Sequence, residues 1–95
     1  MKIILNEFAA EELEDTVEFY EQQVDGLGSR FKDEIKKALR SIKQNPQAWP
    51  PETPDIKKFI LYKFPYKILY SIEPDYIYVI AIAHMHRRPQ YWSAR

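Results

Sequence analysis

The sequence predicts an α+β fold of the order β-α-α-β-β-β, in which an antiparallel helical hairpin packs on one face of a mostly antiparallel four-stranded sheet. Two segments in the first half of the chain carry apolar residues at helical spacing, and three segments after residue 55 alternate with a period of two. The two helical segments are joined by a link as short as Gly26–Gly28, which makes them antiparallel neighbours. The 95 residues fit one domain over residues 1–95.

The first strand and the first helix follow each other directly. Residues 1–5 (MKIIL) are a short apolar run and predict a strand. Asn6 is a favourable N-cap, and acidic residues follow in the first turns, where the helix dipole stabilises them. The helix carries an apolar stripe of Leu13, Val17, Tyr20 and Val24. Gly26 can adopt the left-handed conformation that ends such a helix.

The second helix is predicted from a stripe of Phe31, Ile35, Leu39 and Ile42. It should end at Asn45, because the residue before a proline is pushed out of helical geometry. Residues 45–54 (NPQAWPPETP) hold four of the seven prolines and predict a crossing loop, with Trp49 packed down as its anchor.

Three strands are predicted at residues 56–62, 66–73 and 76–83. The last has two apolar faces, one with Tyr76, Tyr78, Ile80 and Ile82 and the other with Ile77, Val79, Ala81 and Ala83, so it should be central in the sheet. Two helices cannot cover both faces of four strands. We therefore expect the uncovered face, which bears Lys67, to receive a partner or a substrate.

Composition limits the function classes. The chain has no cysteine, which excludes disulfides and thiolate metal sites. No apolar run is long enough to span a membrane, so we expect a cytoplasmic protein with no membrane partner. The net charge is zero, but residues 1–28 contain eight acids and one base, whereas residues 56–95 contain seven bases and two acids. This asymmetry could direct a polyanion to one face, or it could only aid solubility. We expect the acidic first helix to face solvent or another protein.

Residues 84–92 (HMHRRPQYW) gather both histidines of the chain with two arginines and two aromatic residues. If the strand continues, His84 and His86 point to the same side and could share a metal, but nothing nearby completes a four-ligand site. Each could instead serve as a general acid or base, or as a rim residue that donates to a carbonyl.

Arg87 and Arg88 present donor groups that match phosphate oxygens, and Tyr91 and Trp92 could stack on bases. This combination is typical of a nucleic-acid surface. The alternative is that the arginines pair with acids such as Glu73 while the two aromatic residues cover the edge of the core.

Three features resemble the toxins of the RelE/ParE superfamily in type II toxin–antitoxin systems. They are the helical hairpin, the segment FPYKILYSIE (64–73) and the ending IAHMHRRPQYWSAR (82–95). RelE-like members cut mRNA on the ribosome without a metal, and ParE-like members inhibit DNA gyrase without a catalytic set. The resemblance implies a toxin that causes growth arrest. The leading hypothesis for its activity is ribosome-dependent mRNA cleavage. Gyrase inhibition and a degenerate, binding-only role are the alternatives.

For mRNA cleavage, the resemblance implies roles for seven residues. Lys58 and Lys67 would act on the sheet and Arg87 or Arg88 would clamp the phosphate, while Tyr91, His84 or His86 would transfer a proton. Stabilising the charge of the pentavalent phosphate would be the main contribution to such catalysis. The resemblance implies no cofactor and no metal. It also implies a small antitoxin, encoded nearby, that is largely disordered when free and folds on binding.

Overall fold

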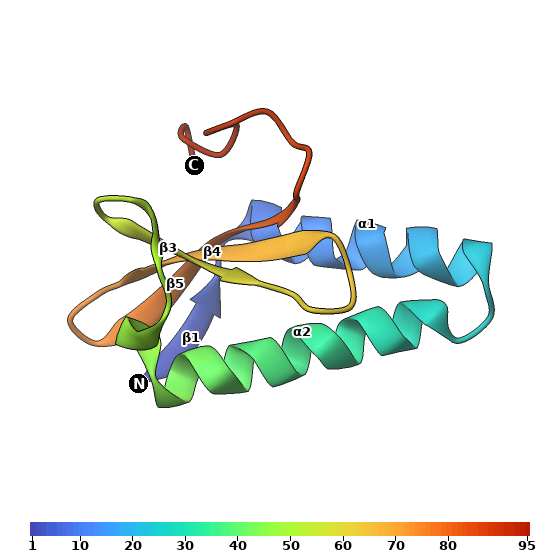
Figure 1. Cartoon of the computed structure of the whole chain (residues 1–95), viewed down its shortest axis with the longest axis horizontal. Coiled ribbons are helices and arrows are strands. Elements are labelled where there is room, and N and C mark those ends of the chain that lie inside the picture. Colours follow the sequence, from blue (N-terminus) through green and yellow to red (C-terminus); the bar gives the residue numbers. More distant parts are fainter.

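The computed structural model describes all residues from 1 to 95 and confirms the predicted fold class (Figure 1). The elements run in the order β1 (Lys2–Leu5), α1 (Glu7–Gln23), α2 (Leu27–Gln44), a 3₁₀ turn η1 (Pro46–Ala48), β2 (Pro51–Thr53), β3 (Ile56–Ile60), β4 (Tyr66–Ile72) and β5 (Tyr76–His84). The strands form one sheet of order β1-β5-β4-β3-β2, in which β1 is parallel to β5 and the other pairs are antiparallel. The sheet thus has one strand more than expected.

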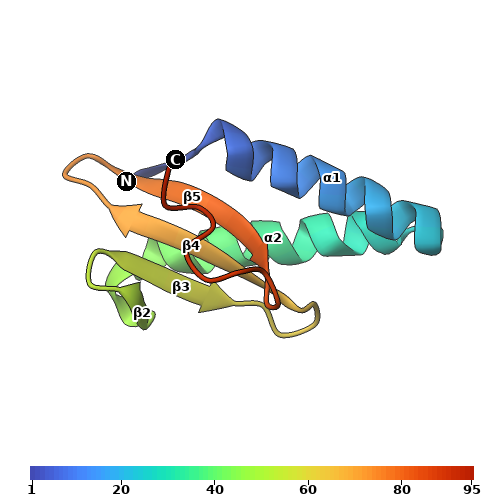
Figure 2. The same cartoon turned by 90° about the horizontal axis from the view of Figure 1, so that it is seen from above.

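The two helices form the predicted antiparallel hairpin on one face of the sheet (Figures 1 and 2). At the start of α1, the side chain of Asn6 accepts a hydrogen bond of 2.7 Å from the backbone N–H of Phe8, as expected of an N-cap. Gly26 has a φ of 86°, the left-handed conformation predicted for it. The Glu21 carboxylate accepts from the backbone N–H groups of Gly26 and Gly28, which stabilises the turn between the helices.

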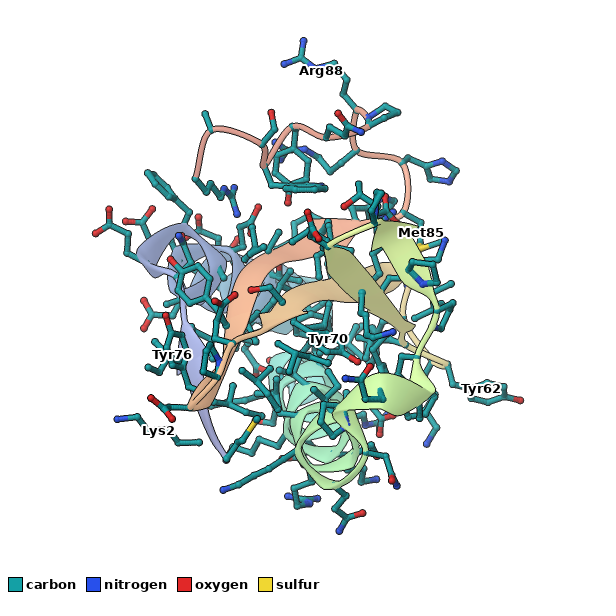
Figure 3. The ribbon with its side chains drawn as sticks, turned by 90° about the vertical axis from the view of Figure 1, so that its left-hand side faces the viewer. Lys2, Tyr62, Tyr70, Tyr76, Met85 and Arg88 are labelled. Atoms are coloured by element: carbon teal, nitrogen blue, oxygen red, sulfur yellow. The ribbon has the colours of Figure 1, made fainter.

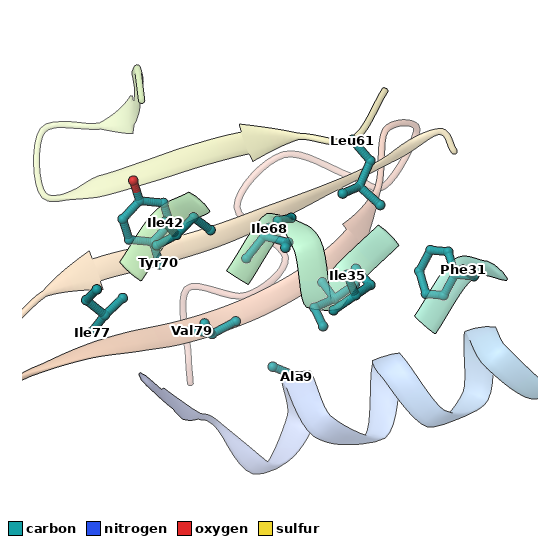
Figure 4. Packing of buried hydrophobic residues seen from close by; sticks show 11 residues of the cluster. Ala9, Phe31, Ile35, Ile42, Leu61, Ile68, Tyr70, Ile77 and Val79 are labelled. Atoms are coloured by element: carbon teal, nitrogen blue, oxygen red, sulfur yellow. The ribbon is translucent and has the colours of Figure 1, made fainter. Parts of the chain in front are cut away.

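The main core lies between α2 and the helix-facing side of the sheet (Figure 4). Its largest fully buried side chains are Phe31, Ile35, Ile42, Ile68, Tyr70, Ile77, Val79 and Ile82. The hydroxyl of Tyr70 donates to the carbonyl of Pro46 at 2.7 Å and so fixes η1 against the sheet. The stripe predicted for α2 is confirmed, and on β4 Tyr66, Ile68, Tyr70 and Ile72 face this core.

A β-bulge in β5 changes the faces that strict alternation predicts for this strand. Leu69 pairs with Ala81, but the next residue, Tyr70, pairs with Val79, so Ile80 has no partner in β4. Ile80 and Ala81 therefore both lie on the side away from the helices, where they pack together. The prediction that Ile80 shares a face with Ile82 was wrong, because Ile82 is in the helix-facing core.

The stretch predicted as a crossing loop, residues 45–54, contains η1 and the short strand β2, so its description as loop alone was wrong. Trp49 does anchor it, since its ring packs edge-on against Phe59 with centroids 4.5 Å apart. The strand predicted at residues 56–62 is β3, which ends at Ile60, two residues before the predicted end.

The face of the sheet away from the helices, which we call the outer face, is partly covered by the chain itself. Residues 85–95, the tail, fold back across β4 and β5 (Figures 1 and 2). Trp92 is 9% exposed and packs against Leu69, Ile80 and Ala81. The expectation of an open face beside Lys67 is therefore corrected, because the tail already occupies its centre.

Neither helix offers an apolar stretch long enough to cross a bilayer.

Candidate functional site

Four of the seven residues predicted for catalysis, Lys67, Arg87, Arg88 and Tyr91, line one narrow cleft on the outer face, but the two histidines lie elsewhere. Lys58 and Lys67 lie on the outer face, because β3 and β4 pair Lys58 with Leu69 and Ile60 with Lys67. His84 pairs with Tyr66, the neighbour of Lys67 in β4, and successive residues of a strand point to opposite faces. The lysines and His84 are thus on opposite sides of the sheet.

The two outer-face lysines share one carboxylate. Both oxygens of Glu52, in β2, lie 3.0 Å from the Nζ of Lys67, and its Oε1 lies 3.7 Å from the Nζ of Lys58. The side chains are only 16% (Glu52), 19% (Lys67) and 32% (Lys58) exposed, so solvent screens these ion pairs less than it would on an open surface. Glu52 therefore offsets much of the positive charge that a phosphate would require here.

Tyr91 is also engaged within the molecule. Its hydroxyl donates to Oε2 of Glu12, in α1, at 2.5 Å. Burial raises the pKa of the Tyr91 hydroxyl, and the hydrogen bond to Glu12 raises it further. In this state Tyr91 is a poor source of a proton for catalysis, because the proton is held against a carboxylate.

Glu12 is the centre of a cluster that sequence reasoning missed. Besides Tyr91, it accepts two hydrogen bonds from the Arg95 guanidinium, at 2.7 and 2.9 Å, and one from the backbone N–H of Ile82 at 3.0 Å. The hydrogen bond with Glu12 raises the pKa of Arg95. Arg95 also donates to the carbonyl of Ile80. At this position the expectation that α1 faces solvent or another protein was wrong, because Glu12 binds the chain's own tail.

Arg87 and Arg88 remain without an acidic partner. The guanidinium of Arg87 stacks on the ring of Tyr91, with 3.9 Å between its central carbon and the ring centroid. Arg88 extends away from the sheet into solvent (Figure 3). The alternative pairing with Glu73 does not occur, since the carboxylate of Glu73 accepts from Ser71 instead. These two arginines are the cations of the tail that are free to bind a partner.

The histidines lie side by side at the end of β5. The ring of His84 packs edge-on against Tyr66, with centroids 5.1 Å apart, and lies 5.3 Å from the ring of His86. The backbone N–H of His86 donates to Nδ1 of His84 at 3.0 Å. No third histidine or acidic group joins them in a cluster that could hold a metal ion.

A small cavity of about 170 Å³ lies beside His84, where α1, β4, β5 and the tail meet. Its lining mixes carboxylates with a cation and two phenols: Glu12, Asp15, Thr16, Tyr66, Ile82, His84, Arg87 and Tyr91. The two carboxylates oppose the binding of a phosphate. Arg87 is the one predicted cation that lines this cavity, and it also lines the narrow cleft beside Glu52 and Lys67 on the outer face.

Comparison with known proteins identifies a family and several similar solved structures. A family model described as "ParE toxin of type II toxin-antitoxin system, parDE" matches residues 3–89. None of the curated proteins matches the chain. Among solved structures, a chain from "Chromosomal ParDE TA system from P. aeruginosa" is similar with a TM-score of 0.66 and 16% identity. That similarity covers 88% of this chain and 95% of the other, and at this identity it supports the fold alone.

Proposed function

Because the chain belongs to the ParE toxin family of type II toxin–antitoxin systems, we propose that it inhibits DNA gyrase in the cytoplasm and does not cut mRNA. The observation that carries this proposal is that the carboxylate of Glu52 forms ion pairs with both Lys58 and Lys67. A ribonuclease without a metal needs free cations to stabilise the negative charge on the phosphate in the transition state. Here the two lysines that would provide them are already paired.

The positions of the two proton-transfer candidates, His84 and Tyr91, support the same proposal. The lysines lie on the outer face, and His84 lies on the helix-facing side. Tyr91, the other candidate for proton transfer, donates to Glu12. Proton transfer and charge stabilisation must act on the same phosphate, so this arrangement favours inhibition by binding.

Ribosome-dependent mRNA cleavage remains the competing function, and one observation favours it: Arg87 and Arg88 are unpaired cations beside Lys67, and Arg87 also lines the cavity at His84. Two assays separate the functions. Purified protein added to gyrase and relaxed plasmid should inhibit supercoiling. Primer extension on cellular mRNA after induced expression should reveal no cuts linked to codons.

A Lys58→Gln/Lys67→Gln variant sharpens the comparison. For a gyrase inhibitor that does not use the lysine pair, it should inhibit supercoiling as strongly as the original chain. Uninhibited gyrase together with mRNA cuts that disappear in this variant would establish the ribonuclease function instead.

We further propose that a cognate antitoxin neutralises this toxin. A groove of about 480 Å³ runs along the helical hairpin, with Ala10, Leu13 and Val17 as its apolar residues and Glu14, Glu18 and Glu21 among its polar ones. An amphipathic helix could bury its apolar face there, as in other helix-in-groove complexes. Co-expression with the neighbouring short reading frame should give a stable complex, and replacing Leu13 with Asp should weaken it.

A further inference from the structure

We propose that Glu52 closes a phosphate-binding site formed by Lys58 and Lys67 on the outer face, and that it thereby keeps this chain from binding single-stranded nucleic acid. This inference goes beyond gyrase inhibition. It concerns a binding site that the chain possesses but occupies with its own carboxylate, and it can be tested on the purified protein without gyrase or ribosomes.

The contact geometry identifies the ligand class. Two ammonium groups from adjacent strands converge on one oxyanion, with Nζ–O distances of 3.0 Å to Lys67 and 3.7 Å to Lys58. A phosphate group carries the same kind of acceptor oxygens as a carboxylate and binds lysine ammonium groups in the same way. Glu52 therefore stands where a phosphate oxygen would otherwise be held.

The backbone is anchored both before and after Glu52, and this holds Glu52 in position. The carbonyl of Pro50 accepts from the backbone N–H of Lys58 at 2.9 Å, and the carbonyl of Trp49 accepts from Nζ of Lys57 at 3.0 Å. Strand β2 pairs Pro51 with Lys57 and Thr53 with Ile56, and its register shifts between these pairs. Since the backbone is anchored, Glu52 meets the lysines with less loss of conformational entropy than a flexible surface side chain would.

The surroundings favour a polyanion once this carboxylate is neutralised. The narrow cleft between Glu52, Lys67 and the tail is also lined by Arg87, Arg88 and Tyr91, and Glu52 is its one acidic residue. Removing that charge would leave the lysine pair and the two unpaired arginines on the same side of the molecule. Cations beside an aromatic ring are the usual combination in single-strand binding.

The test is the affinity for a fluorescein-labelled 12-nucleotide oligouridine, measured by fluorescence anisotropy over a range of potassium chloride concentrations. Glu52→Gln, which preserves the shape of the side chain, should bind about tenfold more tightly than the original chain at low salt. Its plot of log affinity against log salt should also be steeper by about 1.4, because two phosphate contacts are gained at about 0.7 each.

Two controls separate a specific site from a general effect of charge. Glu34→Gln removes a carboxylate that is paired with Lys37 at 3.3 Å on α2, so it changes the net charge equally and should leave the affinity within about twofold. Adding Lys58→Gln and Lys67→Gln to Glu52→Gln should abolish the gain. An equal gain in Glu34→Gln, no gain in Glu52→Gln, or a gain that survives loss of both lysines would each overturn the proposal.

A second comparison covers the case in which Glu52→Gln does not fold. In the original background, Lys58→Gln/Lys67→Gln should bind the oligonucleotide as well as Lys36→Gln/Lys43→Gln, a variant of equal charge with changes at exposed positions on α2. Markedly weaker binding by the first variant would mean that the lysine pair is available despite Glu52, and the proposal would be wrong.

Discussion

Glu12 and Tyr91 are 79 residues apart in the chain, and the hydroxyl of Tyr91 donates to the carboxylate of Glu12 at 2.5 Å. This hydrogen bond joins the first helix to the tail. Arg95 and the backbone N–H of Ile82 bind the same carboxylate, so one acidic side chain holds three separate parts of the molecule together. The cluster explains why the tail lies on the sheet.

Replacing Glu12 with Ala should lower the free energy of unfolding by about 2–3 kcal/mol, because it leaves the partly buried Arg95 and the N–H of Ile82 without their acceptor. Urea denaturation followed by circular dichroism measures the change. Glu11→Ala, at the exposed neighbouring position, should change the free energy by less than about 0.5 kcal/mol. Equal stabilities of the two variants would show that the cluster contributes nothing.

Replacing Trp92 with Ala should lower the free energy of unfolding by about 3 kcal/mol. Trp92 is the largest side chain of the buried cluster that it forms with Leu69, Ile80 and Ala81 on the outer face, and its loss exposes Leu69 and Ala81. Thermal and urea denaturation measure the effect. Ser93→Ala, at the exposed next residue, is the matched control and should be close to neutral. A neutral Trp92→Ala would mean that the tail does not pack on the sheet in solution.

Stability should decline at alkaline pH. Burial raises the pKa of Tyr70 to about 12 from an ordinary value of 10.0, and the pKa of Tyr91 is raised as well. A raised pKa in the folded state means that the stabilisation is complete below pH 10 and is lost as the pH approaches 12. For Tyr70 the loss amounts to about 2–3 kcal/mol over that interval.

Urea denaturation at a series of pH values between 8 and 11.5 tests this decline. Tyr70→Phe should cost about 1 kcal/mol at pH 8, because the hydrogen bond to Pro46 is lost, and its stability should fall less steeply with pH. Identical pH dependence of the two proteins would contradict the assignment to Tyr70.

At Gly28 the two helices leave no room for a side chain, and Gly28→Ala should destabilise the hairpin. A methyl group there would lie 2.4 Å from the carbonyl oxygen of Val17 and 3.0 Å from Cβ of Glu21, so the helices would have to separate. We expect a loss of about 2–3 kcal/mol by urea denaturation. Gly26→Ala meets no neighbouring atom within 4 Å and should cost only the strain of its positive φ, about 1 kcal/mol. A smaller loss at Gly28 than at Gly26 would be inconsistent with this packing.

The sequence was sufficient for the order of the two helices and the four predicted strands, but not for η1, β2 or the faces of β5. Helical stripes and alternating strands depend on neighbours a few residues apart, so α1, α2 and β4 could be located from local pattern. Both faces of β5 are apolar, so alternation offers no polar residue to mark a shift. The bulge at Ile80 therefore has no signal in the sequence, although it decides that Ile80 covers the outer face.

In the candidate site, too, some residues could be predicted from the sequence and others only from the structure. Local pattern placed His84, Arg87, Arg88 and Tyr91 at the end of β5 or just beyond it, where the structure has them. The resemblance to a toxin superfamily was confirmed by the family match. Glu12, Glu52 and Arg95 were missed because each is an ordinary charged residue in a local view. Glu52 is also in a proline-rich stretch that has no strand pattern, so its pairing with Lys67, 15 residues later, was not visible.

The sequence alone therefore determined the fold class, the helical hairpin, the core of α2 and β4, and the superfamily, because these depend on local periodicity and on contiguous motifs. The tertiary structure decided which charges are free. Whether Lys58 and Lys67 can meet a phosphate, and whether Tyr91 can give up a proton, depends on carboxylates that folding brings within 2.5 to 3.7 Å from distant positions. At such distances in a partly buried setting, a single acidic side chain is enough to change what a basic surface can bind.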